Sequence, residues 1–194
     1  MAIFRGMTTY TPPQRTATLA DAPAIAALMR ASVLELFPRF YDERQTLSAA
    51  EHIASLDLRL IEDGTYFVHE ADGEIVACGG WSRRNRTHAG AGDAADDDRP
   101  LDPATEPARV RAMFVRADWT RRGLGRAILE SCRLAAKAEG FSSLTLTATL
   151  PGVPLYLSFG FTEVERVTVT TPDGVDVPGA VMARDIDEPD SIEA

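Results

Sequence analysis

The stretch MFVRADWTRRGLGR, residues 113–126, carries most of the fold information in this sequence. It predicts the end of a buried strand, then a short turn with two glycines among four arginines, then the start of an amphipathic helix. The N-terminus of a helix has unpaired N–H groups and the positive end of the helix dipole, and glycine lets an anion approach the main chain closely. The stretch therefore predicts a site that binds a phosphate group on backbone amides.

The residues around this stretch predict a strand–helix–strand unit. Residues 108–115 read as a central strand, 123–139 as a helix closed by Gly140, and 144–149 as the next strand, parallel or nearly parallel to the first. The apolar face of the helix consists of Leu124, Ala127, Ile128, Cys132, Ala135 and Ala138. A short helix is expected to follow at 154–159.

Two predicted hairpins flank this unit. The first joins strands at 65–70 and 74–81 through Asp72-Gly73, a strong turn signal, and the second joins strands at 161–170 and 177–183. We therefore predict an α/β domain with α+β character, in which helices flank a twisted, mixed β-sheet.

The residues before the first hairpin predict an arm, a strand and two helices. The expected elements are a flexible arm at 1–14, a strand at 15–19, a helix capped by Asp21, and a second helix from Leu47 with Ile53, Leu56 and Leu60 on one face. Between the helices lies an aromatic loop, residues 37–41. It either packs over the edge of the core or forms part of a substrate wall.

The chain is expected to form a single domain at 15–186, followed by an acidic tail at 187–194. Within it, residues 82–107 form a polar loop that is unusually long for a compact domain. Such a loop is either disordered or functional.

Composition limits the function classes. A formal net charge of -9 over 194 residues argues against nucleic-acid or membrane-surface binding as the main activity. The sequence shows no signal-peptide core and no apolar run of membrane-spanning length. Cys78 and Cys132 lack a metal or redox motif, and the three histidines are scattered. We therefore expect a cytoplasmic protein with reduced cysteines and no metal.

The common nucleotide motifs do not fit the glycine turn. A dinucleotide fingerprint needs a third glycine, where this chain has Ile128, and an acidic residue at the end of the next strand, which 144–149 lacks. A P-loop needs Gly-Lys-Ser/Thr, which does not occur here.

The pattern instead resembles the GCN5-related N-acetyltransferase (GNAT) family. RRGLGR at 121–126, opening a helix after MFV at 113–115, is similar to the family's pyrophosphate loop, Arg/Gln-x-x-Gly-x-Gly/Ala. YLSFGF at 156–161 is similar to its Tyr-x-x-x-Gly-Phe element, and the order of elements agrees over roughly 16–186. The chain departs from the family pattern at Thr120, where Arg or Gln is frequent, and at Thr149, where asparagine is frequent.

The resemblance implies direct attack of an amine, on a small molecule or a peptide end, on the thioester of acetyl-CoA. The strand end Met113, Phe114 and Val115 would hold the pantetheine arm and the acetyl carbonyl. The pyrophosphate would bind to Arg121, Arg122, Gly123, Leu124, Gly125 and Arg126, mainly through main-chain amides. Tyr156 would protonate the departing thiolate.

Alternatives remain open at several of these residues. Tyr156 is otherwise a core aromatic with a satisfied hydroxyl, and Arg126 otherwise points to solvent. The whole domain is otherwise a non-catalytic acyl-CoA sensor, or an acyltransferase for another acyl group or for a hydroxyl acceptor. A homodimer through an exposed sheet edge is a further option.

The sequence does not identify the general base. Glu106, His88 and Tyr66 are candidates, and water that passes the proton to bulk solvent is equally plausible.

Several arginines near the long loop form either an anion pocket or ion pairs. They are Arg83, Arg84, Arg86, Arg109 and Arg111, and the candidate partners are Asp93, Asp96, Asp97 and Asp98. We favour pairing, because runs of charge usually form solvated faces. Trp81 is either a lid on the core or part of the substrate wall.

Overall fold

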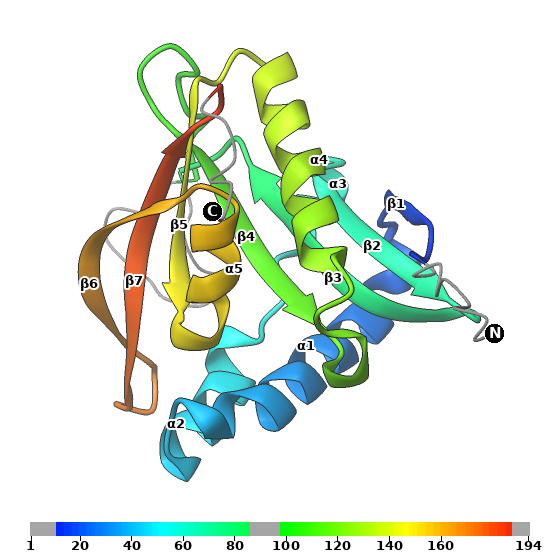
Figure 1. The fold of residues 1–194 in the computed structure, drawn as a ribbon, viewed down its shortest axis with the longest axis vertical. Coiled ribbons are helices and arrows are strands. Elements are labelled where there is room, and N and C mark those ends of the chain that lie inside the picture. The colour runs from blue at the N-terminus through cyan, green and yellow to red at the C-terminus, as the bar shows by residue number, and fades with distance from the viewer. Residues whose placement is uncertain (1–10, 86–97, 188–194) are drawn as a thin grey trace, which may run out of the picture.

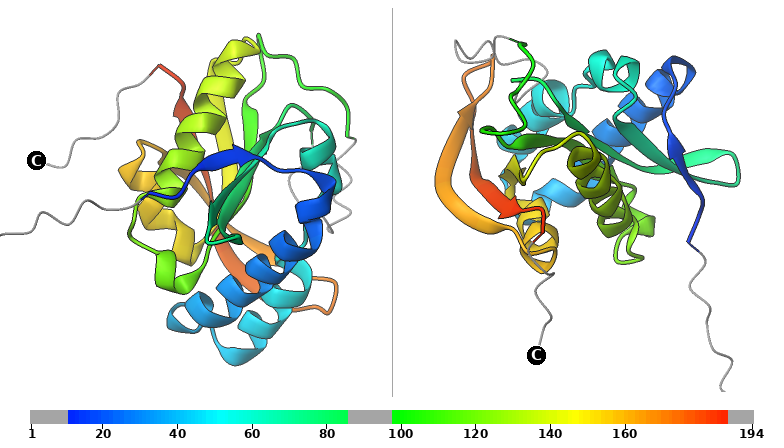
Figure 2. Two further views of the ribbon diagram at one scale, coloured as in Figure 1. Left: turned by 90° about the vertical axis from the view of Figure 1, so that its right-hand side faces the viewer. Right: turned by 90° about the horizontal axis from the view of Figure 1, so that it is seen from above.

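The computed structural model describes residues 11–85 and 98–187. These residues form a seven-stranded mixed sheet in the order β1-β2-β3-β4-β5-β7-β6, with helices on both of its faces (Figure 1, Figure 2). The strands are β1 Gln14–Thr16, β2 Tyr66–Ala71, β3 Glu74–Ser82, β4 Ala108–Val115, β5 Ser143–Thr149, β6 Thr162–Thr170 and β7 Asp176–Asp185. The predicted fold class, a mixed sheet flanked by helices, is confirmed.

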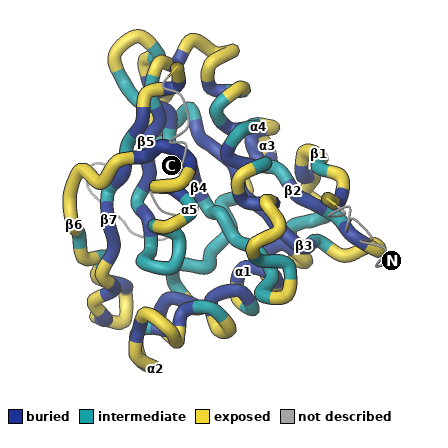
Figure 3. Tube along the Cα trace, in the orientation of Figure 1, coloured by how far each residue is buried: buried dark blue, intermediate teal, exposed yellow. Residues whose placement is uncertain are grey.

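The helices divide between the two faces of the sheet. They are α1 Ala22–Leu36, α2 Glu43–Ser48, the π-helical η3 Ala49–Ile53, α3 Leu58–Glu62, α4 Leu124–Ala138 and α5 Val153–Ser158. Side chains of α4 and α5 share one buried cluster with β3, β4, β5 and β7. Side chains of α1 and α3 form a second cluster on β2 and β3. Figure 3 shows the resulting dark, buried centre of the sheet. None of the described helices is long and apolar enough to span a membrane.

Most local predictions agree with the structure. The first hairpin turns at Asp72 and Gly73 with φ of 52° and 79°, the left-handed conformation that an Asp-Gly turn favours. Strand β4, helix α4 and strand β5 follow in the predicted order. The predictions for residues 1–10, 86–97 and 188–194, which include most of the predicted arm and tail, lie outside the described residues.

The second predicted helix is wrong as a single element. The chain forms α2 and the π-helical η3 up to Ile53, leaves helical structure, and starts again as α3 at Leu58. Apolar side chains at helical spacing are therefore shared between two short segments, which pack on different clusters. The expected cap also differs. Asp21 is at the N-cap position of α1, but its carboxylate accepts from Thr18 and pairs with Arg15 at 2.8 Å.

The base of the long loop is held by main-chain hydrogen bonds. Asn85 N donates to Arg99 O, and Leu101 N donates to Arg83 O, both at 2.8 Å. The two ends of the loop are therefore paired before the chain enters β4.

The central strands β4 and β5 pair only briefly. Their parallel register covers Ala108 with Leu144 and Arg109 with Thr145, after which the strands separate. Strand β4 also contains a bulge opposite β3, where Ala112 has a φ of 52°. The Tyr66 hydroxyl donates to the Ala112 carbonyl at 2.7 Å and so satisfies the main chain at the bulge.

Replacement of Tyr66 by phenylalanine should destabilise the bulge. The partly buried Ala112 carbonyl would lose its donor, which costs about 1 kcal/mol in the free energy of unfolding measured with urea. As a control, Ala112→Gly keeps the carbonyl and relieves the left-handed φ, so its stability should stay close to that of the parent. A Tyr66→Phe protein as stable as the parent would contradict this role.

Candidate functional site

A cavity of about 810 Å³ lies where β4 and β5 separate. Its walls come from the end of β4, the turn before α4, β5, α5, the C-terminal part of α1, the segment after α1 and the β6–β7 turn. The lining includes most of the residues that the sequence singled out: Met113, Phe114, Val115, Arg121, Gly123, Leu124, Gly125, Arg126 and Tyr156.

The glycine turn presents main-chain amides at one end of this cavity. Arg121 and Gly123 have φ of 63° and 82°, and a Cβ at Gly123 would meet nothing within 4 Å, so glycine is favoured there by conformation and not by space. The first main-chain bond of the helix is from Ala127 N to Gly123 O, at 3.0 Å. Within the described ranges, the amides from Arg121 to Gly125 have no acceptor. Such a group of N–H donors at a helix N-terminus binds anionic oxygens.

Only two of the three arginines of the turn line the cavity. Arg121 and Arg126 line the cavity, and Arg126 also donates to Ser158 O at 3.2 Å. Arg122 is not part of the lining. Its guanidinium donates to Asp118 O at 2.9 Å and lies 4.5 Å from the centre of the Trp119 ring. The geometry therefore brings Arg121 and Arg126, but not Arg122, to the cavity.

The end of β4 exposes main-chain groups toward β5. Arg116 N donates to Val76 O, so the alternation of an antiparallel pair turns the polar groups of Val115 away from β3. The Val115 carbonyl accepts from the buried Ser32 hydroxyl of α1 at 2.9 Å. No motif in the sequence predicts a role for Ser32, because a serine on a helix face is common.

Tyr156 reaches the cavity from α5 and packs edge-on against Phe161, with ring centroids 5.8 Å apart. The residue is only 8% exposed, and burial raises its pKa above the ordinary value. In the part of the chain that the structure describes, its hydroxyl has no hydrogen-bond partner. No protein group among the described residues satisfies this hydroxyl, and the catalytic role of Tyr156 stays a prediction.

Two of the three candidate bases from the sequence, Tyr66 and Glu106, do not line the cavity. Tyr66 is fully buried, donates to Ala112 O, and has a pKa raised well above the ordinary value by burial. Glu106 binds Arg99 at 2.6 Å and accepts from Asp102 N, and these bonds lower its pKa to about 2. His88 lies outside the described residues.

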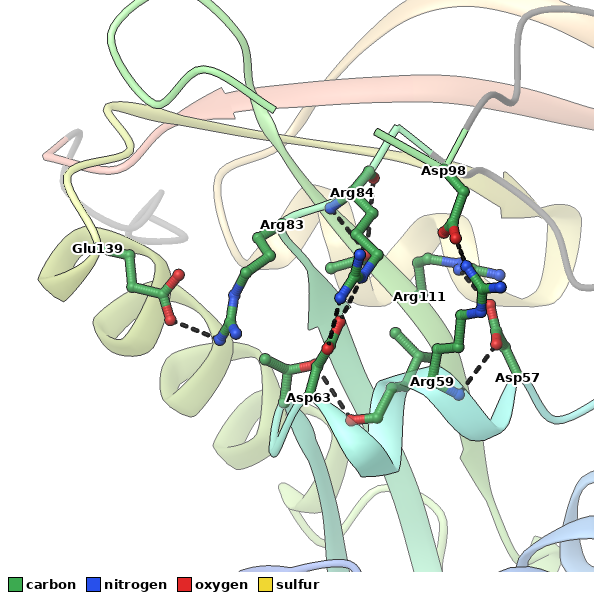
Figure 4. A network of polar contacts seen from close by, with 11 residues as sticks. Asp57, Arg59, Asp63, Arg83, Arg84, Asp98, Arg111 and Glu139 are labelled. Carbon is green, nitrogen blue, oxygen red and sulfur yellow. Dashed lines mark hydrogen bonds and ion pairs between the residues drawn. The ribbon is translucent and has the colours of Figure 1, made fainter. Parts of the chain in front are cut away.

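The arginines near the long loop form ion pairs, as expected, but with different partners (Figure 4). Arg84 binds Asp63 at 2.8 Å, Arg83 binds Glu139 at 2.6 Å, and Arg111 binds Asp57 at 3.0 Å. Asp98 of the loop pairs with Arg59 of α3, and Arg109 donates to Asn85. Among the described residues, Arg83 and Arg84 therefore pair with the ends of α4 and α3, and Asp98, the one predicted loop partner that is described, pairs elsewhere. Arg86, Asp93, Asp96 and Asp97 fall outside the described ranges.

The aromatic loop packs on the core and also lines the cavity. Phe37 and Tyr41 are buried with ring centroids 5.2 Å apart, while Phe40 is 46% exposed, and Phe37 and Phe40 both line the cavity. Trp81, in contrast, is 1% exposed, packs on Phe141 and is not part of the lining. The substrate-wall interpretation is therefore wrong for Trp81.

The polar lining residues that the sequence did not point to include Ser32, His52 and Ser55. His52 and Ser55 lie where a continuous helix was predicted, and the interruption of that helix turns them toward the cavity. No periodic pattern in the sequence marks such an interruption.

Comparisons with known proteins agree with this geometry. Residues 62–163, more than half of the chain, match the family model of the acetyltransferase (GNAT) domain. A GCN5-related N-acetyltransferase structure from Rhodopseudomonas palustris is similar, with a TM-score of 0.70 and 20% identity over 93% of this chain and 99% of that one. No curated protein sequence matches the chain.

Two further similar structures contain ligands according to their descriptions. PaiA N-acetyltransferase from Thermoplasma acidophilum, in complex with coenzyme A, has a TM-score of 0.63 and 13% identity over 91% of this chain and 99% of that one. YncA from Salmonella typhimurium, described as a putative acetyltransferase with acetyl-CoA, has a TM-score of 0.59 and 19% identity over 95% of this chain and 99% of that one. At these identities the likeness concerns the fold.

Removal of Asp57 should destabilise the wall of the cavity more than removal of Asp63. The side chains of Asp57 and Arg111 are 9% and 5% exposed, and Asp57 also accepts from Arg59 N at the start of α3. Asp57→Ala leaves a buried guanidinium without this carboxylate and should cost about 3 kcal/mol in urea unfolding. The matched change Asp63→Ala affects the more exposed Arg84 and should cost about 1 kcal/mol. An equal or larger cost for Asp63→Ala would contradict this ranking.

Proposed function

Since the chain belongs to the GCN5-related N-acetyltransferase family, we propose that it transfers an acetyl group from acetyl-CoA to an amine of a small molecule or a peptide. One observation carries the proposal: unpaired amides of the turn before α4 and the unpartnered hydroxyl of Tyr156 line the same cavity. The descriptions of two similar structures, with coenzyme A and with acetyl-CoA, support this choice of donor.

In this proposal the pyrophosphate of the donor binds to the amides from Gly123 to Arg126. Arg121, at the same end of the cavity, adds positive charge. Amides and a guanidinium that are already in position stabilise anionic oxygens without reorganisation, and they supply the charge that a metal ion supplies in other phosphate sites. Arg122, which we also expected here, would need to leave Trp119 to contribute.

The pantetheine arm would lie along the open edge of β4. Main-chain groups of Met113 and Val115 on that edge would bind its amides, in the manner of an added strand, with Phe114 between them. The thioester would then lie between the two separated strands, with Tyr156 of α5 on the same cavity wall.

Tyr156 would donate its proton to the departing thiolate. Because burial raises its pKa, the phenol is protonated at neutral pH and is suited to act as an acid. The amine nitrogen attacks the thioester carbon, the carbon–sulfur bond breaks, and the sulfur takes the proton from the hydroxyl.

The proposal includes a cytoplasmic location and, as an option, a homodimer. Cys78 and Cys132 are buried and free, which suits a reducing compartment. Strand β6 is an edge strand with a largely exposed face, which a second copy could cover.

Acetyl-CoA should raise the melting temperature of the protein in a concentration-dependent way. At about 100 times its Kd, a ligand of the native state stabilises by about 2.7 kcal/mol, which for a domain of this size is roughly 5–10 °C. As a control, S-acetyl-pantetheine lacks the pyrophosphate and should give a clearly smaller shift. No shift at millimolar acetyl-CoA would exclude the proposal.

Tyr156→Phe should lower turnover and leave the donor bound. We expect kcat for an accepted amine to fall about 100-fold, because the thiolate would leave without a proton donor. The melting temperature and the Kd of acetyl-CoA should hardly change, because the hydroxyl has no partner among the described residues. Leu157→Ala is the matched control on the exposed side of the same helix and should keep the parental rate. An unchanged kcat in Tyr156→Phe would remove this residue from the mechanism.

A further inference from the structure

The proposed reaction needs a base, and the cavity offers one imidazole. Amines bind as ammonium ions near neutral pH and must lose a proton before they can attack a thioester. Among the described residues that line the cavity there is no aspartate or glutamate. His52 is the histidine in that lining, and it comes from the acceptor side of the cavity, with Phe40 and Ile53.

His52 lies between the cavity and solvent. The same side chain also lines a shallower hollow of about 380 Å³ on the outside, together with Glu43, Arg44, Glu51 and Asp173. Its side chain is 26% exposed. An imidazole in this position can take a proton on one side and release it on the other.

The local backbone at His52 is unusual. Residues Ala49–Ile53 form a π-helical turn directly after α2. Such turns are rare and occur often at functional sites, because they change the direction of one side chain relative to its neighbours. Here the next residues leave helical structure, and both His52 and Ser55 line the cavity.

The carboxylate of Asp173, which accepts two hydrogen bonds, lies next to the imidazole of His52. His52 Nε2 is 3.7 Å from Asp173 Oδ2, while Asp173 Oδ1 accepts from Thr171 Oγ1 at 2.6 Å and from Ser48 Oγ at 2.8 Å. The hydrogen bonds from Thr171 and Ser48 lower the pKa of Asp173, so this carboxylate stays charged. A charged carboxylate that is held in place favours the imidazolium that forms when histidine takes a proton.

On these grounds we propose that His52, backed by Asp173, is the general base of the acetyl transfer and passes the amine proton to solvent in the outer hollow. The inference rests on the proposed acetyltransferase function and adds a residue to it. His52 acts directly or through one water molecule.

The proton balance of the step is complete. The ammonium N–H bond breaks and its proton moves to the imidazole of His52, which releases it to water in the hollow. The neutral nitrogen bonds to the carbonyl carbon, and the carbon–sulfur bond breaks. The sulfur takes a proton from Tyr156, whose oxygen recovers one from the nitrogen as the amide forms. The net products are the amide, free CoA and the one proton that His52 received.

The charges around His52 determine how its role depends on pH. Asp173 faces it from the β6–β7 turn, Glu43 and Arg44 from α2, and Glu51 from its own turn, while Arg39 lines the cavity side. Glu51 pairs with Arg30 of α1 at 3.2 Å. Asp173 is the carboxylate nearest to the imidazole, at 3.7 Å from Nε2, so it is the partner that the test addresses.

The test is the pH profile of kcat/KM for an accepted amine in the full chain. His52→Gln should lower kcat/KM about 100-fold at neutral pH. The loss should shrink as pH rises, because the amine then loses its proton in solution. Asp173→Asn should lower kcat/KM by a smaller factor than His52→Gln, and added imidazole should partly restore His52→Ala. Each variant should show the parental melting shift with acetyl-CoA, which reports that it is folded.

Arg30→Gln is the matched control. It removes a charge that pairs beside His52, but Arg30 lines neither the cavity nor the outer hollow. Its profile should coincide with that of the parent. A parental profile in His52→Gln, or a failure of imidazole to restore any activity in a folded His52→Ala protein, overturns the role of His52 and leaves the acetyltransferase proposal intact. A parent protein that binds no acetyl-CoA and acetylates no amine overturns both.

Discussion

The early separation of β4 and β5 is the constraint on which the rest of the site depends. Their parallel pairing ends at Arg109 and Thr145, so the remainder of β4 has one edge without a strand partner. Main-chain polar groups inside a protein need partners. The hydroxyls of Tyr66 and Ser32 satisfy the carbonyls of Ala112 and Val115. The rest of that edge faces a cavity, which is where a ligand with its own amides can complete the pairing.

The end of β5, on one side of the opening, is tied to β7 by a side chain from outside the sheet. The hydroxyl of Tyr41 accepts from Leu150 N, just after β5, at 2.8 Å and donates to Pro178 O on β7 at 2.7 Å. Tyr41 also packs on Phe37, which lines the cavity. The cavity wall at Phe37 and the end of β5 are therefore fixed by the same residue, so the shape of the cavity depends on packing behind this wall as well as on the residues that line it.

The sequence predicts the parts of this fold that depend on local patterns. Asp72-Gly73 determines a hairpin through its own conformational preference, and the apolar spacing of α4 requires one buried face. The break after Ile53 has no such local cause, because the spacing of Ile53, Leu56 and Leu60 suits a continuous helix equally well. The ion pairs fail for a similar reason. Asp63 is 21 residues before its partner Arg84, and only the folded sheet brings the end of α3 beside this arginine.

The same limit applies to the two groups that would move protons, and their surroundings assign them opposite roles. Tyr156 could be selected by its motif, but only the fold shows that its ring is buried, which raises the pKa of the phenol, and that it lines the cavity. His52 belongs to no motif, and its suitability as a base comes from a carboxylate on a distant hairpin and from contact with two cavities. The other charged side chains in the described lining are arginines. A proton released among them would be repelled by their charge, so an exit beside Asp173 is the favourable route.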